Sequence, residues 1–330
     1  LDPSSAADNI PGALRLTGDL DIEILSAAVT DVIGRHETLR TRYPEIDGVG
    51  FQEILGAGDV AIDLTPVDVA PADLEGEVLG IFGRPFDVSV EVPVRMRLLR
   101  TAPSEYILVV VLHHIAGDGL SLFPLTVDLM AAYTARLRGD TPQWVPLPVQ
   151  YADFALWQRE VLGSELDASS VISQQLAYWE SVLGGVPDEV ELPWDRPRPV
   201  VASYRGGRVD DVVIDAGLHA GISELARRYN ATPFMVVHAA LAVVLARLSG
   251  SDDVVVGTPV AGRGEAALDH LVGMFVNTLV LRTSVTGSMS FADLLREVSD
   301  SDLGAFGHSD VPFERLVEVL NPPRSQGRHP

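Results

Sequence analysis

The sequence predicts an α/β fold, because helical and strand patterns mix in both halves of the 330-residue chain. Three observations carry this prediction. Residues 107–112 are an unbroken valine-rich apolar run, which is typical of a buried strand. Residues 20–33 and 122–137 place apolar side chains at helical spacing. No internal repeat or low-complexity segment interrupts the mixture, so we expect ordinary globular domains.

In the first half of the chain, the sequence predicts elements both before and after the strand at 107–112. Gly34 is expected to end the first helix, and prolines predict an extended loop before the last helix. The expected elements are a helix at 20–33, a turn into a strand at 35–41, a strand at 107–112, a helix at 122–137, an extended loop at 142–148 and a helix from 151.

The second half begins after a lobe boundary that we place near residue 165, which gives lobes at 1–165 and 166–330. Thr232 and Pro233 form a helix start, with an N-cap followed by proline at the first helical position. The expected elements are a helix at 173–183, an extended proline-rich stretch at 192–199, a helix from 233 to about 250, strands at 253–259 and 275–282, a helix capped by Ser290 and a helix at 312–320.

Composition excludes several classes of function. A formal net charge of −22 argues against binding nucleic acid or an anionic membrane surface, since both favour basic patches. The chain has no cysteine, so it has neither disulfides nor thiolate ligands, which is compatible with a reducing cytoplasm. We expect no membrane span and no signal peptide. The first residue is not methionine, so the chain is expected to be cut from something longer.

Paired histidines followed by a glycine-bounded aspartate are the most informative feature. His113 and His114 come where the strand at 107–112 ends, and alternation points them to opposite faces. Gly117 and Gly119 allow a sharp turn that fixes Asp118 behind them. This layout suits an imidazole oriented for proton transfer. The alternatives are a core histidine with a turn carboxylate, or a metal site, which lacks a second set of ligands at suitable spacing.

Other polar and aromatic segments have mainly structural interpretations. Residues 35–42 predict a salt-bridged corner, and the aromatic residues at 151, 154 and 157 predict core packing. Asn277 and Arg282 interrupt an apolar strand and need partners if they are buried, so we expect Arg282 to pair with Asp118. The alternative is that Arg282 and Asp118 both face solvent. Asp310 is expected to cap the helix that follows it.

Together these segments resemble the condensation domain of nonribosomal peptide synthetases. The matching motifs, in the family's order, are RHETLRT (35–41), HHIAGDG (113–119), YADFALWQ (151–158), VGMFVNTLVLR (272–282) and HSDVPFERLVE (308–318). The family's first motif is absent, and the chain stops at 324–330 inside the last one. The C-terminal lobe is therefore expected to be truncated.

The resemblance implies two chloramphenicol-acetyltransferase-like lobes in a V-shaped pseudo-dimer, with an active-site tunnel between them. Donor and acceptor carrier proteins would bring substrates on phosphopantetheine arms, beside adjacent synthetase domains, and the domain would need no cofactor or metal of its own. It would move a donor acyl group from its thioester to the acceptor amine, in a natural-product assembly line in the cytoplasm. By position, His114 is the active-site histidine, and His113, Asp118, Gly119, Asn277 and Arg282 support the site.

The chemistry of amide formation fits this implied role. An α-amino group titrates near pH 8, so part of the acceptor is already neutral, and an imidazole with a pKa of about 6.5 can take the proton that leaves the nitrogen. His114 could instead orient the amine. The alternatives that remain are a stand-alone coenzyme A-dependent acyltransferase, an epimerisation-type relative, and a catalytically silent recruitment module. Heterocyclisation is disfavoured because such domains replace the paired histidines with aspartates.

Overall fold

The computed structural model describes residues 5–187, 190–197 and 213–322. The chain divides into two compact units. Unit 1 comprises Leu1–Glu160 together with Arg263–Val276, and unit 2 comprises Val161–Gly262 together with Asn277–Pro330. A short segment from late in the sequence therefore belongs with the first unit, and this segment matters for the site.

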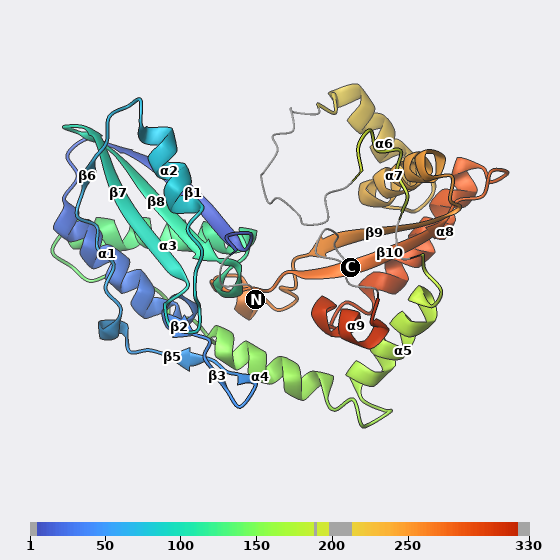
Figure 1. Cartoon of the computed structure of the whole chain (residues 1–330), viewed down its shortest axis with the longest axis horizontal. Helices are drawn as coiled ribbons and strands as arrows, with labels where there is room; N and C mark the ends of the chain where they lie inside the picture. The colour runs from blue at the N-terminus through green and yellow to red at the C-terminus, as the bar shows by residue number, and fades with distance from the viewer. Residues whose placement is uncertain (1–4, 188–189, 198–212, 323–330) are drawn as a thin grey trace. The chain divides into compact units, whose positions relative to one another are not determined.

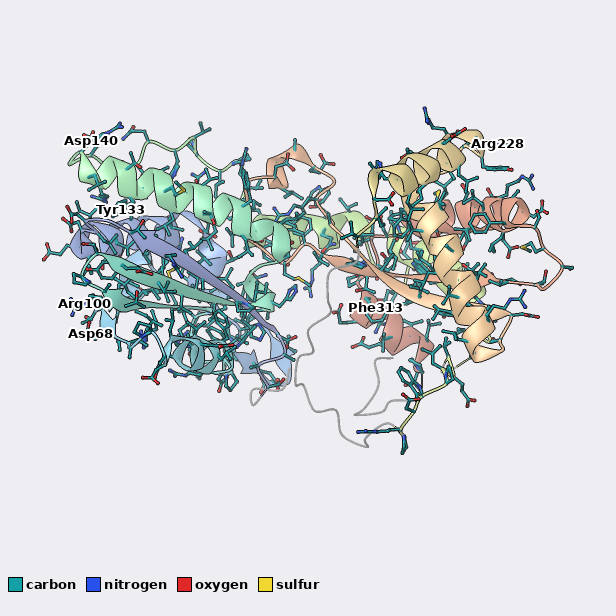
Figure 2. The ribbon with its side chains drawn as sticks, turned by 90° about the horizontal axis from the view of Figure 1, so that it is seen from above. Asp68, Arg100, Tyr133, Asp140, Arg228 and Phe313 are labelled. Carbon is teal, nitrogen blue, oxygen red and sulfur yellow. The ribbon has the colours of Figure 1, made fainter. Side chains whose placement is uncertain are left out.

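Unit 1 is built on a four-stranded sheet in the order β1-β8-β7-β6 (Figure 1). The bounds are Asn9–Thr17 for β1, Val67–Asp68 for β6, Val94–Ala102 for β7 and Glu105–His113 for β8. Strand β8 runs antiparallel to both of its neighbours, and β6 pairs parallel with β7. At the edge of the sheet, Asp68 on β6 forms an ion pair with Arg100 on β7 at 2.8 Å (Figure 2).

Helices cover both faces of this sheet (Figure 1), which explains the continuous apolar run in β8. Leu108, Val110 and Leu112 pack against α1 (Ile22–Arg35) and α3 (Leu122–Leu137). The alternate residues of β8 pack on the other face, against α2 (Leu74–Phe82). Residues 114–121, which follow β8, form what we call the histidine turn. Because α3 begins at Leu122, directly after this turn, the packing of α3 anchors the turn to the core of unit 1.

Shorter elements complete unit 1. They are 3-10 turns at Glu37–Arg40, Ala57–Asp59, His114–Ala116, Gly119–Ser121 and Ala266–Leu268, the strand pairs β2 (Thr41–Arg42) with β5 (Glu53–Ile54) and β3 (Glu45–Ile46) with β4 (Val49–Gly50), and most of helix α4 (Tyr151–Leu162).

Unit 2 contains an antiparallel strand pair and five helices among its described residues. These elements are α5 (Val171–Leu183), α6 (Ala216–Arg228), α7 (Pro233–Ser249), β9 (Asp253–Val260), β10 (Asn277–Ser284), α8 (Phe291–Phe306) and α9 (Phe313–Leu320). Leu279 and Leu281 on β10 pack in a cluster with Trp179 of α5 and Leu316 of α9. A second cluster joins α6, α7 and α8.

Most of the elements expected from the sequence are confirmed. Helix α3 spans the expected residues, Thr232 caps α7, Ser290 caps α8, and Gly250 ends α7 in the left-handed conformation, with φ of 71°. Gly34 does not end α1, which continues to Arg35. The strand expected from 275 begins at Asn277. In the extended stretch at 192–199, the last two residues lie outside the described part of the chain.

Within the described residues no single helix is long and apolar enough to cross a membrane, although α6 and α7, bent by 101°, pass the same length and composition test as a pair.

Candidate active site at the histidine turn

His113 forms part of the wall beneath the turn. It is the last residue of β8 and is 5% exposed, with its ring edge-on to Phe86 at a centroid distance of 6.0 Å. Its Nδ1 accepts a hydrogen bond from the Ile115 N–H at 3.1 Å. Burial lowers the pKa of His113, so this ring is neutral. His113 thus has a structural position. The strand alternation expected for the pair does not extend to His114, because β8 ends at His113 and His114 begins a 3-10 turn.

His114 lies at the start of the next turn and is only half-buried. Its backbone N–H donates to the Asp8 carbonyl at 2.7 Å, which ties the turn to the segment before β1. Its Nδ1 lies 3.1 Å from the Sδ atom of Met274. His114 is therefore a partly accessible imidazole on a fixed backbone, with one ring nitrogen against a thioether.

Asp118 is fully buried, and its carboxylate is satisfied on both oxygens. Oδ1 accepts from the N–H and the hydroxyl of Ser121 at 2.9 and 2.8 Å, and lies 3.2 Å from Arg263 Nη2. Oδ2 accepts from the Phe275 N–H at 3.1 Å. The carboxylate caps its own turn and also holds the segment 263–276, so its role in the described structure is to shape the turn.

Arg263 is the buried partner that sequence reasoning missed. Its side chain is 6% exposed, and its guanidinium carbon lies 4.2 Å from the centroid of the Phe275 ring. Its Nη1 donates to the carbonyls of Leu268 and Leu271 at 2.6 and 2.9 Å. The only sequence signal was an arginine between two glycines directly after a strand, which does not by itself indicate burial.

The expected pairing of Asp118 with Arg282 is wrong. Arg282 forms a two-pronged ion pair with Asp253, at 2.9 and 2.8 Å, and its Nη1 donates to the Val182 and Gly184 carbonyls. The register explains this choice. Arg282 on β10 lies opposite Val255 on β9, so Asp253 is its diagonal neighbour on the same face of the strand pair.

Asn277 caps a helix within unit 2. Its Nδ2 donates to the Ser309 and Val311 carbonyls at 2.9 and 2.7 Å, and its Oδ1 accepts from the N–H of Phe313, the first residue of α9, at 3.0 Å. The expectation that Asp310 caps this helix is therefore wrong, because the Asp310 carboxylate accepts from Gln175 instead. A role for Asn277 near the reacting groups stays a prediction.

Replacing Asn277 with aspartate keeps the acceptor for the Phe313 N–H and tests the two hydrogen bonds that Nδ2 donates to the Ser309 and Val311 carbonyls. The change preserves shape but turns two carbonyl-facing donors into a carboxylate oxygen, so we expect the free energy of unfolding to fall by about 1–3 kcal/mol. Urea denaturation measures the change. Asn230→Asp is the matched control, since it adds the same charge at an exposed position. Equal losses in the two variants would contradict this role of the Nδ2 donor.

The segment carrying Met274 is held at three consecutive residues. Ser121 Oγ lies 3.2 Å from the Gly273 nitrogen, the Tyr151 hydroxyl donates to the Met274 carbonyl at 2.7 Å, and the Phe275 N–H donates to Asp118. Burial, with a further contribution from Asp118, raises the pKa of Tyr151 to about 12, so the hydroxyl stays a donor. A Cβ at Gly273 would lie 2.8 Å from the Phe275 ring and closer still to Tyr151, so only glycine fits.

Two other expectations concern packing near the turn. The salt-bridged corner is confirmed, because Asp128 accepts from Arg35 and contacts His36, both at 2.8 Å. The aromatic core is confirmed for Tyr151 and Phe154, whose rings pack against Phe275. It is wrong for Trp157, which is 47% exposed.

Gly119 and the surface beyond it are open. Gly119 is exposed, and a Cβ there would meet nothing within 4 Å.

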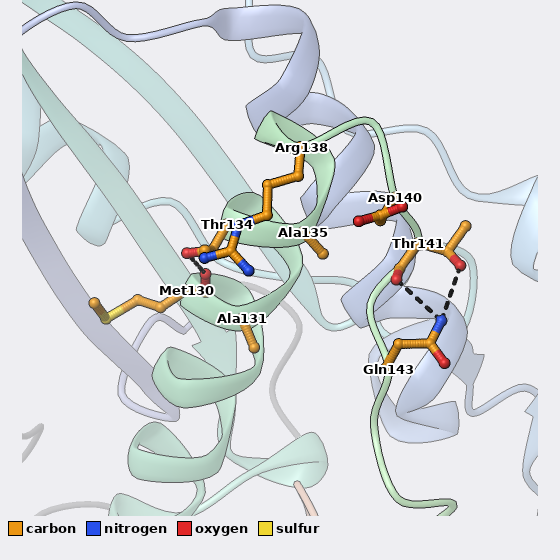
Figure 3. Close-up of a pocket in the computed structure, with 8 residues that line it drawn as sticks. All are labelled: Met130, Ala131, Thr134, Ala135, Arg138, Asp140, Thr141 and Gln143. Carbon is orange, nitrogen blue, oxygen red and sulfur yellow. Dashed lines mark hydrogen bonds between the residues drawn. The ribbon is translucent and has the colours of Figure 1, made fainter.

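Further along α3, a separate surface hollow contains none of the predicted site residues (Figure 3). Its lining is Met130, Ala131, Thr134, Ala135, Arg138, Asp140, Thr141 and Gln143. Among the described residues, no group of three or more histidine, aspartate or glutamate side chains could hold a metal ion.

Comparison with known proteins identifies related chains. A family model described as "Condensation domain" matches residues 1–330. The chain is 52% identical over 99% of its length to a probable non-canonical nonribosomal peptide synthetase, CymA, of Salinispora arenicola, and covers 4% of that protein. It is 50% identical over 98% of its length to an isonitrile lipopeptide synthase of Mycobacterium tuberculosis, and covers 13% of it. The chain thus spans a small part of these relatives.

Solved structures match the fold. The X-domain from teicoplanin biosynthesis superposes with a TM-score of 0.93 at 35% identity, over 100% of this chain and 72% of that one. The first condensation domain of the CDA synthetase superposes with a TM-score of 0.70 at 22% identity, over 97% of this chain and 75% of that one, which concerns the fold alone. The expected α/β fold of the chloramphenicol-acetyltransferase-like type is therefore confirmed.

Proposed function

Because the chain belongs to the condensation-domain family of nonribosomal peptide synthetases, we propose that it joins two carrier-bound substrates through an amide bond. The acceptor amine nitrogen bonds to the donor's thioester carbon, and the carbon–sulfur bond then breaks. The proton from the nitrogen is transferred in the same sequence of steps, and the donor carrier is left with a free thiol. Both substrates arrive on phosphopantetheine arms, so the chain supplies no cofactor of its own.

The observation that carries this proposal is the partly accessible imidazole of His114, on a turn where the buried His113, Asp118 and Ser121 side chains are hydrogen-bonded within the protein. His113 beneath it is buried and neutral, and Asp118 is saturated with hydrogen bonds. His114 is therefore the residue of this turn that is left to act on a substrate. A neutral imidazole can take the proton from the cationic nitrogen of the tetrahedral intermediate, or orient the amine before attack.

A thioester is already activated, so this reaction needs no serine or cysteine nucleophile. The chain contains no cysteine, which agrees with such a mechanism. In our proposal the backbone N–H of Gly119 contacts a substrate, because the residue is exposed and the space around its α-carbon is open. The remaining polar groups of the turn hold its shape.

The experiment that tests this function uses the domain within its synthetase, with separately loaded donor and acceptor carriers. Mass spectrometry of the acceptor carrier should show the mass of the condensed product. Several outcomes would overturn the proposal. These are product formation from a free coenzyme A thioester without carriers, inversion of a carrier-bound residue without condensation, and carrier binding with no covalent change.

A further inference from the structure

The contact between His114 and Met274 determines which ring nitrogen carries the hydrogen. A thioether sulfur has lone pairs and no hydrogen to donate, so it is only an acceptor. The facing Nδ1, 3.1 Å away, must therefore be the donor. We propose that Met274 is a positioning residue that selects the Nδ1–H tautomer of His114 and leaves the lone pair on Nε2. This inference rests on the proposed function, because it names the nitrogen that takes the amine proton.

Met274 is suited to this role because its backbone is fixed. The Tyr151 hydroxyl holds the Met274 carbonyl at 2.7 Å, while Ser121 holds Gly273 and Asp118 holds Phe275. These three anchors come from α4 and from the histidine turn itself. Two of the anchoring residues, Ser121 and Asp118, belong to the turn that also carries the His114 imidazole. The position of the sulfur relative to the imidazole is therefore set before any substrate binds.

The neighbouring histidine provides a built-in comparison. His113 Nδ1 accepts a hydrogen bond from the Ile115 N–H, so its lone pair is on Nδ1 and its hydrogen on Nε2. Two adjacent histidines therefore hold opposite tautomers. Of these two histidines in their neutral state, His114 is the one with its lone pair on Nε2, the ring nitrogen that does not contact the thioether.

The chemical consequence concerns one proton. As the carbon–nitrogen bond forms, the nitrogen becomes cationic, and His114 Nε2 takes its proton to give an imidazolium. The carbon–sulfur bond then breaks, and the imidazolium returns the proton to the departing thiolate. An Nε2–H tautomer lacks the lone pair for the first of these transfers, so any population of that tautomer is unproductive.

Nitrogen-15 NMR of the histidine-labelled chain at pH 8 tests the tautomers directly. We expect Nδ1–H for His114 and Nε2–H for His113, with each signal assigned by its loss in His114→Gln or His113→Gln. Met274→Leu keeps the bulk and removes the acceptor, so the His114 signals should shift towards a mixture of tautomers while those of His113 stay unchanged. Met274→Gln supplies a carbonyl acceptor and should restore the Nδ1–H form.

Kinetics with loaded carriers give the second measurement. Met274→Leu should lower kcat several-fold and leave KM for either carrier near the wild-type value, and Met274→Gln should recover most of kcat. Met289→Leu, which removes a thioether from unit 2, is the matched control and should change neither.

Two results would overturn the role of Met274. One is an Nε2–H tautomer of His114 in the wild-type chain, and the other is a His114 tautomer that Met274→Leu leaves unchanged. Failure of the proposed function is a distinct result, because it leaves the NMR pattern intact while no condensed product forms on the acceptor carrier.

Discussion

Replacing His114 with alanine is expected to lower the rate of amide formation by about 100-fold or more, the usual scale for a group that transfers a proton. The variant keeps the buried His113 and the saturated Asp118, so the turn should retain its shape. The rate is measured as condensed product on the acceptor carrier over time. Circular dichroism and thermal unfolding of the same preparation verify that the fold is intact.

The control for this loss is an exposed histidine elsewhere in the chain. His219→Ala on α6 removes an imidazole without touching the turn, and it should leave the rate unchanged. Near-wild-type turnover by His114→Ala would exclude His114 as a major contributor. Because the assay starts from carrier-bound substrates, the result concerns the condensation step and not substrate loading.

Replacing Asp118 with alanine is expected to reduce the free energy of unfolding by about 3–5 kcal/mol, because it leaves the Arg263 guanidinium buried without its counter-charge. The same change removes the hydrogen-bond acceptor of the Phe275 N–H and the cap of the turn at Gly119–Ser121. Urea denaturation measures the loss. Faster hydrogen exchange at the Phe275 amide should show that the destabilisation is centred on the segment 263–276.

Two variants sharpen this second prediction. Asp253→Ala removes the partner of Arg282 in a pair that is partly exposed, with 33% exposure of the Asp253 side chain, so it should cost about 1 kcal/mol or less. Adding Arg263→Met to Asp118→Ala should recover part of the loss, because no unpaired charge then stays buried. A soluble, fully stable but inactive Asp118→Ala protein would contradict the structural role.

Local patterns were sufficient for many elements of the fold. Helix α3 and the cap of α7 follow from apolar spacing and from Thr232 with Pro233, which act within a few residues of each other. Strands β1 and β7 were not anticipated. Strand β7 carries three arginines among its apolar residues, and β1 is largely exposed or half-buried, so neither shows a strong apolar run. Each of these strands pairs with β8, one on either side, and this pairing between distant segments leaves no local sequence pattern.

The sequence by itself determined the α/β class, the family resemblance and the location of the histidine turn, because those depend on residues that are contiguous or close in the chain. Only the tertiary structure decided the partners. Arg263 lies 145 residues from Asp118, and Met274 lies 160 residues from His114. Which distant group meets a buried carboxylate or an imidazole depends on strand register and segment packing. The strand register places Arg282 beside Asp253, and the packing of the segment 263–276 in unit 1 places Arg263 and Met274 at the turn.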